Sequence, residues 1–119
     1  METINGEDNV MAKFTLESTA VGCQHCNQDV IDDMLGTEDS MLEELLGLKF
    51  EPDNPYDKNA IQVTFRGKKA GYIPKDKTAE AKAFMEAAEK YHLPYRWNFT
   101  NARVKSDVLQ WFSFTITAE

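Results

Sequence analysis

Apolar and polar residues alternate over several stretches of the chain, and this alternation predicts short β-strands. Residues 60–65 are the clearest example, since Ile61, Val63 and Phe65 share one face while the residues between them are polar or small. On the same grounds, strands are predicted over residues 13–21, 48–50, 60–65, 69–73, 95–104 and 109–117.

Turn signals separate these strands. Gly67 lies in an Arg-Gly-Lys sequence and accepts positive φ without steric cost, so a hairpin is predicted there. Pro74 stops the strand over residues 69–73, because proline lacks a backbone N–H. Residues 105–107 are expected to turn between the last two strands.

Two other segments have the 3.6-residue period of amphipathic helices. Residues 27–47 predict one helix that ends at Gly36 and a second that Thr37 caps and Gly47 closes. Their apolar positions are Val30, Ile31, Met34, Leu35, Met41, Leu42, Leu45 and Leu46. A third, Ala-rich helix is predicted over residues 76–91. Its expected inner side is Ala83, Phe84, Ala87, Ala88 and Tyr91.

Six short strands with two to three helices in 119 residues predict a mainly β, α+β domain. We expect a small antiparallel, OB-like β-barrel or strongly curled sheet with flanking helices. Residues 13–119 are predicted to form this single domain, and residues 1–12 a flexible acidic tail.

The composition favours an intracellular, cytoplasmic protein without a membrane partner. No apolar run approaches the roughly 20 residues that cross a bilayer. The first residues, METINGEDNVMAK, are acidic and polar, unlike a secretory signal.

The net charge of −7 is unevenly distributed. Residues 1–48 contain eleven acids and one base, residues 49–77 seven bases and four acids, and residues 78–119 five of each. A phosphate-containing partner is therefore expected, if anywhere, on the middle segment, because local charge decides what a groove holds.

That basic segment contains an elaborate turn, Asp-Asn-Pro-Tyr-Asp. Pro55 fixes its own φ and moves Asn54 out of the helical region. Asp53, Asn54 and Asp57 are types that bond nearby backbone N–H groups in Asx-turns. One interpretation is thus a rigid turn whose polar side chains are used locally.

The wider segment resembles the HIRAN domain family. EPDNPYDKNAIQV at residues 51–63, followed by KKAGYIP at residues 68–74, matches a family pattern in order and spacing. AVGCQH at residues 20–25 is similar to the end of the family's opening strand, and the resemblance covers residues 14–90.

The resemblance implies an OB-like β-barrel that binds single-stranded DNA and recognises its free 3′ end, in repair or at replication forks. Tyr56 would stack on a base and Asp57 would accept a hydrogen bond from the 3′-hydroxyl. Asn54 would orient the sugar or base edge, Tyr72 would line the same groove, and Lys75 would contact phosphate.

The chain departs from the family pattern after its first strand. DNA-binding members have Arg followed by Tyr where this chain has Gln24 and His25, which we also place in the candidate site. The alternative function is a protein-interaction adaptor, in which the acidic insert over residues 29–46 binds a basic partner through its apolar stripe, Met41–Leu45.

The sequence predicts neither a cofactor nor an enzyme. Cys23 and Cys26 form a lone CxxC around His25, and structural zinc sites need about four ligands. A redox pair would need a CxxC at a helix N-terminus after a buried strand, so reduced structural thiols are favoured over both alternatives. No catalytic triad, phosphate-binding loop or supported carboxylate pair is present in the sequence.

Overall fold

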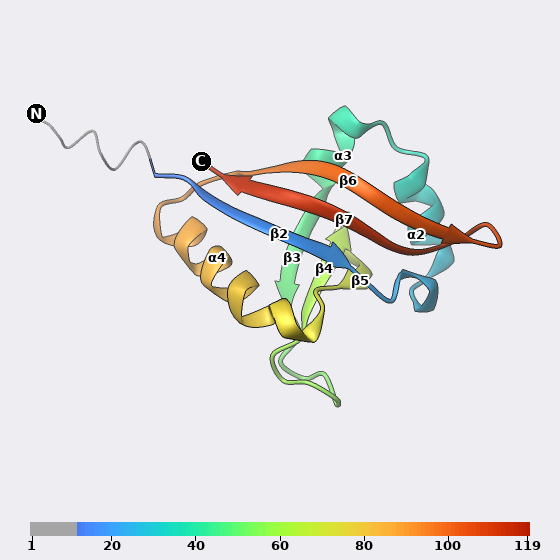
Figure 1. The fold of residues 1–119 in the computed structure, drawn as a ribbon, viewed down its shortest axis with the longest axis horizontal. Helices are drawn as coiled ribbons and strands as arrows, with labels where there is room; N and C mark the ends of the chain where they lie inside the picture. The colour runs from blue at the N-terminus through green and yellow to red at the C-terminus, as the bar shows by residue number, and fades with distance from the viewer. Residues whose placement is uncertain (1–11) are drawn as a thin grey trace, which may run out of the picture.

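The computed structural model describes residues 12–119, so the predicted tail lies almost entirely outside the described residues. Six strands and three α-helices make up the described chain (Figure 1). In chain order the elements are β2 (Phe14–Ala20), η1 (Cys23–His25), α2 (Gln28–Leu35), α3 (Asp39–Leu45), β3 (Leu46–Phe50), β4 (Ile61–Phe65), β5 (Lys68–Tyr72), η2 (Lys75–Lys77), α4 (Thr78–Lys90), β6 (Tyr95–Lys105) and β7 (Val108–Ala118).

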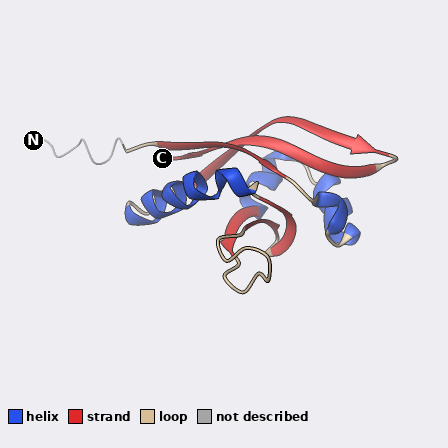
Figure 2. Cartoon of the chain, turned by 60° about the horizontal axis from the view of Figure 1, so that its bottom comes forward, coloured by secondary structure: helices blue, strands red, loops and turns tan. Residues whose placement is uncertain are grey.

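The strands form two antiparallel sheets, in the orders β2-β7-β6 and β3-β4-β5. The sheet β2-β7-β6 has the longer strands and is called the larger sheet, and β3-β4-β5 is the smaller sheet. Figure 2 shows the larger sheet as one layer, with the helices and the curled smaller sheet beneath it. A two-way backbone pair joins the sheets, in which Val21 and Tyr72 exchange N–H···O bonds of 2.8 and 2.9 Å. The α+β class and the six strands are confirmed. The described strands do not close into the expected barrel, because this isolated pair is the one ladder contact between the two sheets in the described chain.

Alternate residues of the strands fill the core between the layers, as the sequence pattern predicted. The largest fully buried side chains of the strands are Leu16, Ile61, Val63, Phe65, Leu109, Phe114 and Ile116, and Ile31 of α2 joins them. Each contributes about 1.5–3 kcal/mol through burial of apolar surface. Two tight hairpin turns set the registers, with positive φ at Arg66-Gly67 and at Ser106-Asp107.

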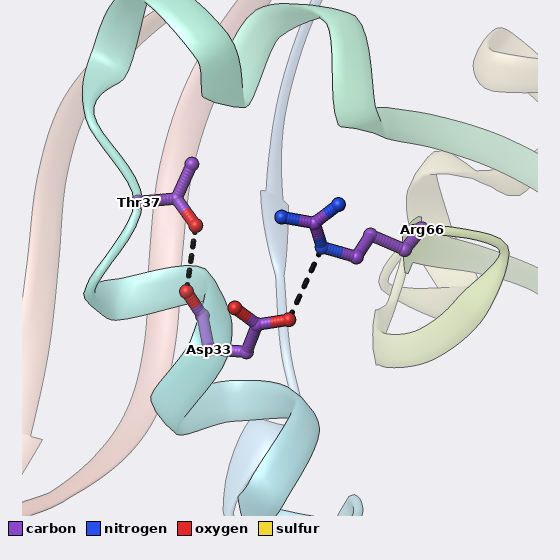
Figure 3. A network of polar contacts seen from close by, with 3 residues as sticks. All are labelled: Asp33, Thr37 and Arg66. Atoms are coloured by element: carbon purple, nitrogen blue, oxygen red, sulfur yellow. Dashed lines mark hydrogen bonds and ion pairs between the residues drawn. The ribbon is translucent and has the colours of Figure 1, made fainter.

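The helical insert differs from its prediction at its two boundaries. Thr37 does not cap the start of α3. Its hydroxyl instead donates to the carbonyl of Asp33 in α2 at 2.7 Å, just beyond the end of that helix (Figure 3). Leu46 and Gly47 are not helical but begin β3, opposite Phe65 and Thr64. Pairing in the sheet leaves Leu46 only 8% exposed, and this burial overrides the local helical pattern.

The buried side of α4 is rotated relative to its prediction. The helix buries the stripe Ala81, Phe84 and Ala88, whereas Ala83 and Tyr91 are exposed. Phe84 packs on Tyr95 with a centroid separation of 5.2 Å, which sets the rotation. No helix within residues 12–119 is long and apolar enough to span a membrane.

Gly71 lies where the two sheets approach each other. A Cβ at this position would lie 3.2 Å from the Cβ of Ala20, the sulfur of Cys23 and the carbonyl oxygen of Val21. A side chain at this position would therefore force its neighbours to shift by a few tenths of an ångström where β5 pairs with Val21. This packing gives a physical reason for the glycine of the Gly-Tyr-Ile-Pro sequence.

We expect Gly71→Ala to lower the free energy of unfolding by about 1–3 kcal/mol, the usual cost of overpacking. Urea unfolding followed by tryptophan fluorescence measures the change. Gly36→Ala is the control, because a Cβ there meets its nearest atom, the carbonyl oxygen of Asp32, at an ordinary 3.4 Å. Equal stability of the two variants would contradict the proposed role of the close approach.

Candidate nucleic-acid interface

The loop between β3 and β4 projects from the body of the domain (Figure 1). Its base is closed by a hydrogen bond from the N–H of Glu51 to the carbonyl of Ala60, at 2.9 Å. Inside the loop, the N–H of Asn54 donates to the carbonyl of Glu51 at 3.1 Å, and the N–H of Ala60 donates to that of Asp57 at 3.1 Å. The backbone of this exposed loop is thus held by its own hydrogen bonds.

Two side chains complete the turn. Asn54 Oδ1 accepts the N–H groups of Tyr56 at 2.8 Å and Asp57 at 3.0 Å, and Asp57 Oδ1 accepts that of Asn59 at 2.9 Å. The prediction of local Asx bonding is confirmed for Asn54 and Asp57. Among the described residues, the carboxylate of Asp53 makes no hydrogen bond. Asn54 therefore stabilises the turn by accepting two of its backbone N–H groups.

The ordered turn presents a tyrosine to solvent. Tyr56 is 92% exposed, and within residues 12–119 its side chain makes no hydrogen bond or aromatic contact. The next residue, Asp57, uses one carboxylate oxygen in the turn, and its second oxygen has no hydrogen-bond partner in the described part of the chain. An aromatic face and a carboxylate oxygen are thus available side by side.

A polar network ties this turn to β5. The hydroxyl of Tyr72 donates to Glu51 Oε1 at 2.6 Å, and Asn54 Nδ2 donates to the same oxygen at 3.2 Å. Lys69 Nζ donates to the hydroxyl of Tyr72 at 3.2 Å and lies 5.0 Å from the centre of its ring. The network orients Tyr72 relative to the turn.

The same contacts shift the pKa values of the three titratable groups. The hydrogen bond from Tyr72, supported by those from the neighbouring amides, lowers the pKa of Glu51. Burial, and then the bond to Glu51, raise the pKa of Tyr72, while the bond to Tyr72 raises that of Lys69. At neutral pH the network therefore consists of a carboxylate, a neutral phenol and an ammonium group.

The remaining candidate residues lie on segments next to this network. Gln24 and His25 are exposed in η1. This short helix comes just after Val21, whose backbone pairs with that of Tyr72. Lys75 is exposed at the start of η2, just after Ile73, whose N–H donates to the carbonyl of Ile61 at the loop base, at 2.9 Å.

Asn54 and Tyr72 are thus linked by one shared acceptor, the carboxylate of Glu51. Apart from the bond between its backbone N–H and Asn54, Tyr56 makes no hydrogen bond or aromatic contact with another candidate residue in the described chain, so their joint action on a ligand stays a prediction.

Sequence reasoning missed Glu51 and Lys69 as members of the site. Glu51 stands inside the quoted motif, but nothing in the sequence showed which hydroxyl it would accept from. Lys69 and Tyr72 are three apart, which places them on opposite faces of a regular strand. A register shift of β5 opposite Val63 and Thr64 brings them to the same side.

The acidic insert is anchored away from the loop. Asp33 on α2 pairs with Arg66 at 3.1 Å (Figure 3). Arg66 comes directly after the last residue of β4, whereas the projecting loop comes directly before the first residue of β4, so the two lie at opposite ends of this strand. Glu43 on α3 pairs with Arg96 at 3.2 Å. In Figure 1, α2 and α3 accordingly lie at the other end of the smaller sheet from the loop. The acidic side chains therefore do not surround the exposed turn.

The CxxC pair has the character of buried thiols. Burial raises the pKa of Cys23 to about 12 and also raises that of Cys26. Each sulfur donates to a backbone carbonyl, those of Ala20 and Gly22, at 3.6 Å. Both thiols are therefore protonated at neutral pH, which disfavours reactive chemistry. Within residues 12–119, no group of three or more His, Cys, Asp or Glu side chains is placed to hold a metal ion.

Two antiparallel sheets, three α-helices and a projecting loop define a small α+β domain. The HIRAN domain family model matches residues 13–110, and the chain belongs to this family. Its fold is similar to the HIRAN domain of human HLTF, with a TM-score of 0.52 and 20% identity, covering 88% of this chain and 76% of that one.

A protein from Lactobacillus plantarum is also similar, with a TM-score of 0.50 and 18% identity, covering 91% of this chain and 100% of that one. At these identities the similarity concerns the fold. No curated protein sequence matches the chain.

Removing the hydroxyl of Tyr72 tests the network. In Tyr72→Phe we expect the pKa of Glu51 to rise toward its ordinary value of 4.5, because the main cause of its lowering is gone. A lowered pKa stabilises the fold above the unfolded-state pKa, and this contribution is lost as pH falls through the folded-state value. Wild type should therefore be more stable than Tyr72→Phe at neutral pH, with the difference shrinking under acid.

Carboxyl ¹³C NMR titration measures the pKa, and urea unfolding at several pH values measures the stability. Tyr56→Phe is the matched control, because its hydroxyl contacts none of the described residues. An unchanged Glu51 titration in Tyr72→Phe would show that the hydrogen bond does not form in solution.

Proposed function

We propose that this domain is a non-enzymatic nucleic-acid-binding module that recognises single-stranded DNA at its free 3′ end, in DNA repair or replication. Membership of the HIRAN family supports a DNA-binding module. The specific recognition of an end, the cellular role and an intracellular location are part of the proposal.

The observation that carries the proposal is the exposure of Tyr56 on an ordered turn. A tyrosine left 92% exposed gains nothing for the fold, yet the surrounding hydrogen bonds hold its backbone in place. Such a pre-ordered aromatic ring provides a stacking surface for a base without the entropic cost of ordering a loop. A terminal base would stack on this ring.

Asp57 supplies the second element of the proposed recognition. Its carboxylate has one oxygen bonded to the N–H of Asn59, and the other would accept a hydrogen bond from the 3′-hydroxyl. A 3′-phosphate would instead bring negative charge against the carboxylate. This pair of effects would distinguish a free end from a blocked one.

The other candidate residues would extend the contact along the strand. Lys75 would neutralise a backbone phosphate, and Tyr72 would line the groove beside Glu51. Gln24 and His25 would meet the neighbouring nucleotide, with an amide and a small ring in place of the Arg and Tyr of the family pattern. Asn54 would act mainly by holding the turn, and its remaining amide N–H would reach the sugar or base edge.

End recognition is tested by the affinity of the domain for short single-stranded DNA carrying a 3′-hydroxyl or a 3′-phosphate. We expect tighter binding of the 3′-hydroxyl strand, and a loss of about tenfold or more in Asp57→Asn, because hydrogen bonds to charged groups contribute about 1.5–3 kcal/mol. Asparagine keeps the Oδ1 that accepts the N–H of Asn59, so the turn is retained.

Fluorescence anisotropy at two salt concentrations measures these affinities. Asp53→Asn is the control, because it makes the same charge change on a neighbouring side chain without hydrogen bonds in the described structure. Equal affinity for both strands, lost with salt, would reduce the interaction to nonspecific attraction.

The stacking role of Tyr56 is tested separately. We expect Tyr56→Ala to lose about 1–3 kcal/mol of binding free energy, the usual value of one base on one aromatic ring. Tyr56→Phe should bind like wild type, since the ring rather than the hydroxyl stacks. Both variants should unfold at the wild-type urea concentration, because the side chain is exposed. A Tyr56→Ala protein that binds normally would remove Tyr56 from the site.

A further inference from the structure

An apolar hollow of about 370 Å³ lies between the acidic helices and the larger sheet, away from the projecting loop. The apolar side chains that line it are Met34, Leu35, Leu42, Leu46, Phe99, Ala102, Leu109 and Phe112. Leu109 is 2% exposed and Leu35 is 56% exposed, so the hollow runs from the core to solvent. It is large enough to count among ligand pockets, which occupy about 300–1,000 Å³.

The wall formed by the helices is strongly negative. Residues 28–46 contain seven carboxylates and no lysine or arginine. Two of these, Asp33 and Glu43, pair with arginines. The others make no ion pair within the described residues and are all exposed: Asp29, Asp32, Glu38, Asp39 and Glu44. Asp39 lines the hollow itself, and no cationic side chain does.

This combination excludes several occupants on physical grounds. Nucleic acid would place phosphates against the carboxylates. Residues 1–11 of the same chain contain three acids and no lysine or arginine, so their charge has the wrong sign. A second copy of the chain carries a net charge of −7 and is repelled overall. An apolar surface that has Asp39 in its lining and is formed in part by two acidic helices fits a partner with apolar side chains and the opposite charge.

We propose that the hollow docks a basic amphipathic segment of a partner protein. Aliphatic side chains on one face of the segment would fill the space between Leu42 and Phe112. Lysines or arginines on its other face would meet the unpaired carboxylates of α2 and α3. This is the helix-in-groove mode of recognition, with apolar anchors and a complementary charged rim.

The proposed surface differs from the apolar stripe expected from the sequence. Met41 is 51% exposed but does not line the hollow, whereas Leu35 on α2 and Phe99 on β6 do. The surface is therefore built by two helices and the β6–β7 hairpin together. It lies apart from the proposed DNA site, so the domain would be able to hold a protein and a DNA end at the same time.

The proposal is tested by NMR on the ¹⁵N-labelled full chain. Three synthetic probes are compared: an amphipathic Leu/Lys peptide, its counterpart with Glu in place of each Lys, and a scrambled Leu/Lys peptide of the same composition. We expect the amphipathic basic peptide to shift the amide signals of Leu35, Leu42 and Ala102 at the lowest concentration. The acidic peptide should shift none of them, and the scrambled one should bind more weakly.

Matched variants assign the binding to the hollow. Ala102 lines the hollow and is exposed, so Ala102→Trp would fill the space without disturbing the core. We expect Ala102→Trp and Asp39→Lys each to weaken the basic peptide about tenfold, as one lost anchor or one reversed charge does. Glu89→Lys is the charge control on α4. Binding of single-stranded DNA should be unchanged by Ala102→Trp.

Apolar anchoring is tested by a second matched pair. Leu35→Ser should weaken the basic peptide, whereas Val104→Ser should not, because Val104 is equally exposed, at 57%, but does not line the hollow. The proposal is overturned if the acidic peptide binds equally well or if DNA shifts the same amides. It is also overturned if the chain self-associates through a surface that Ala102→Trp blocks, or if Overhauser contacts place Met1 or Ile4 in the hollow.

Discussion

The two sheets of this domain meet where the backbone of Val21 pairs with that of Tyr72, and the rest of the site depends on this pair. Gly71 favours this close approach, since a Cβ there would lie only 3.2 Å from Ala20 and Cys23. The same pair fixes β5 beside the end of β2, which places η1 next to Tyr72. One tight approach thus positions both the turn network and the segment that contains Gln24 and His25.

The projecting loop combines rigidity with exposure. Asn54 and Asp57 satisfy backbone N–H groups inside the turn, and Glu51 connects the turn to Tyr72. Because the loop makes these bonds itself, it needs no burial to stay ordered, and Tyr56 is left to solvent. Local bonding and ligand binding are often weighed as alternatives for such polar residues. Under the proposed function the first would support the second, since an ordered loop would lose little entropy on binding.

Charge is sorted along the smaller sheet. The β4–β5 hairpin holds Arg66 against Asp33. The opposite end of β4 leads to the exposed turn, and Lys49 and Lys58 are close to this turn in the sequence. The acidic helices therefore lie at one end of the smaller sheet, and the exposed turn lies at the other. A net charge of −7 is compatible with a nucleic-acid site because the charges are separated in space rather than mixed.

The sequence by itself determined the six strands, the helical insert, the two hairpins and the HIRAN motif, because period-two alternation and turn residues act locally. Tertiary structure decided that Leu46 and Gly47 join β3, since pairing with Phe65 and Thr64 outweighs helical pattern. It also left the sheets open rather than closed into a barrel. The contact of Lys69 with Tyr72 depends on a shift in strand register, and the apolar hollow depends on α2, α3 and three strands packing together. Neither leaves a trace in local sequence, because each arises between residues that are close only after folding.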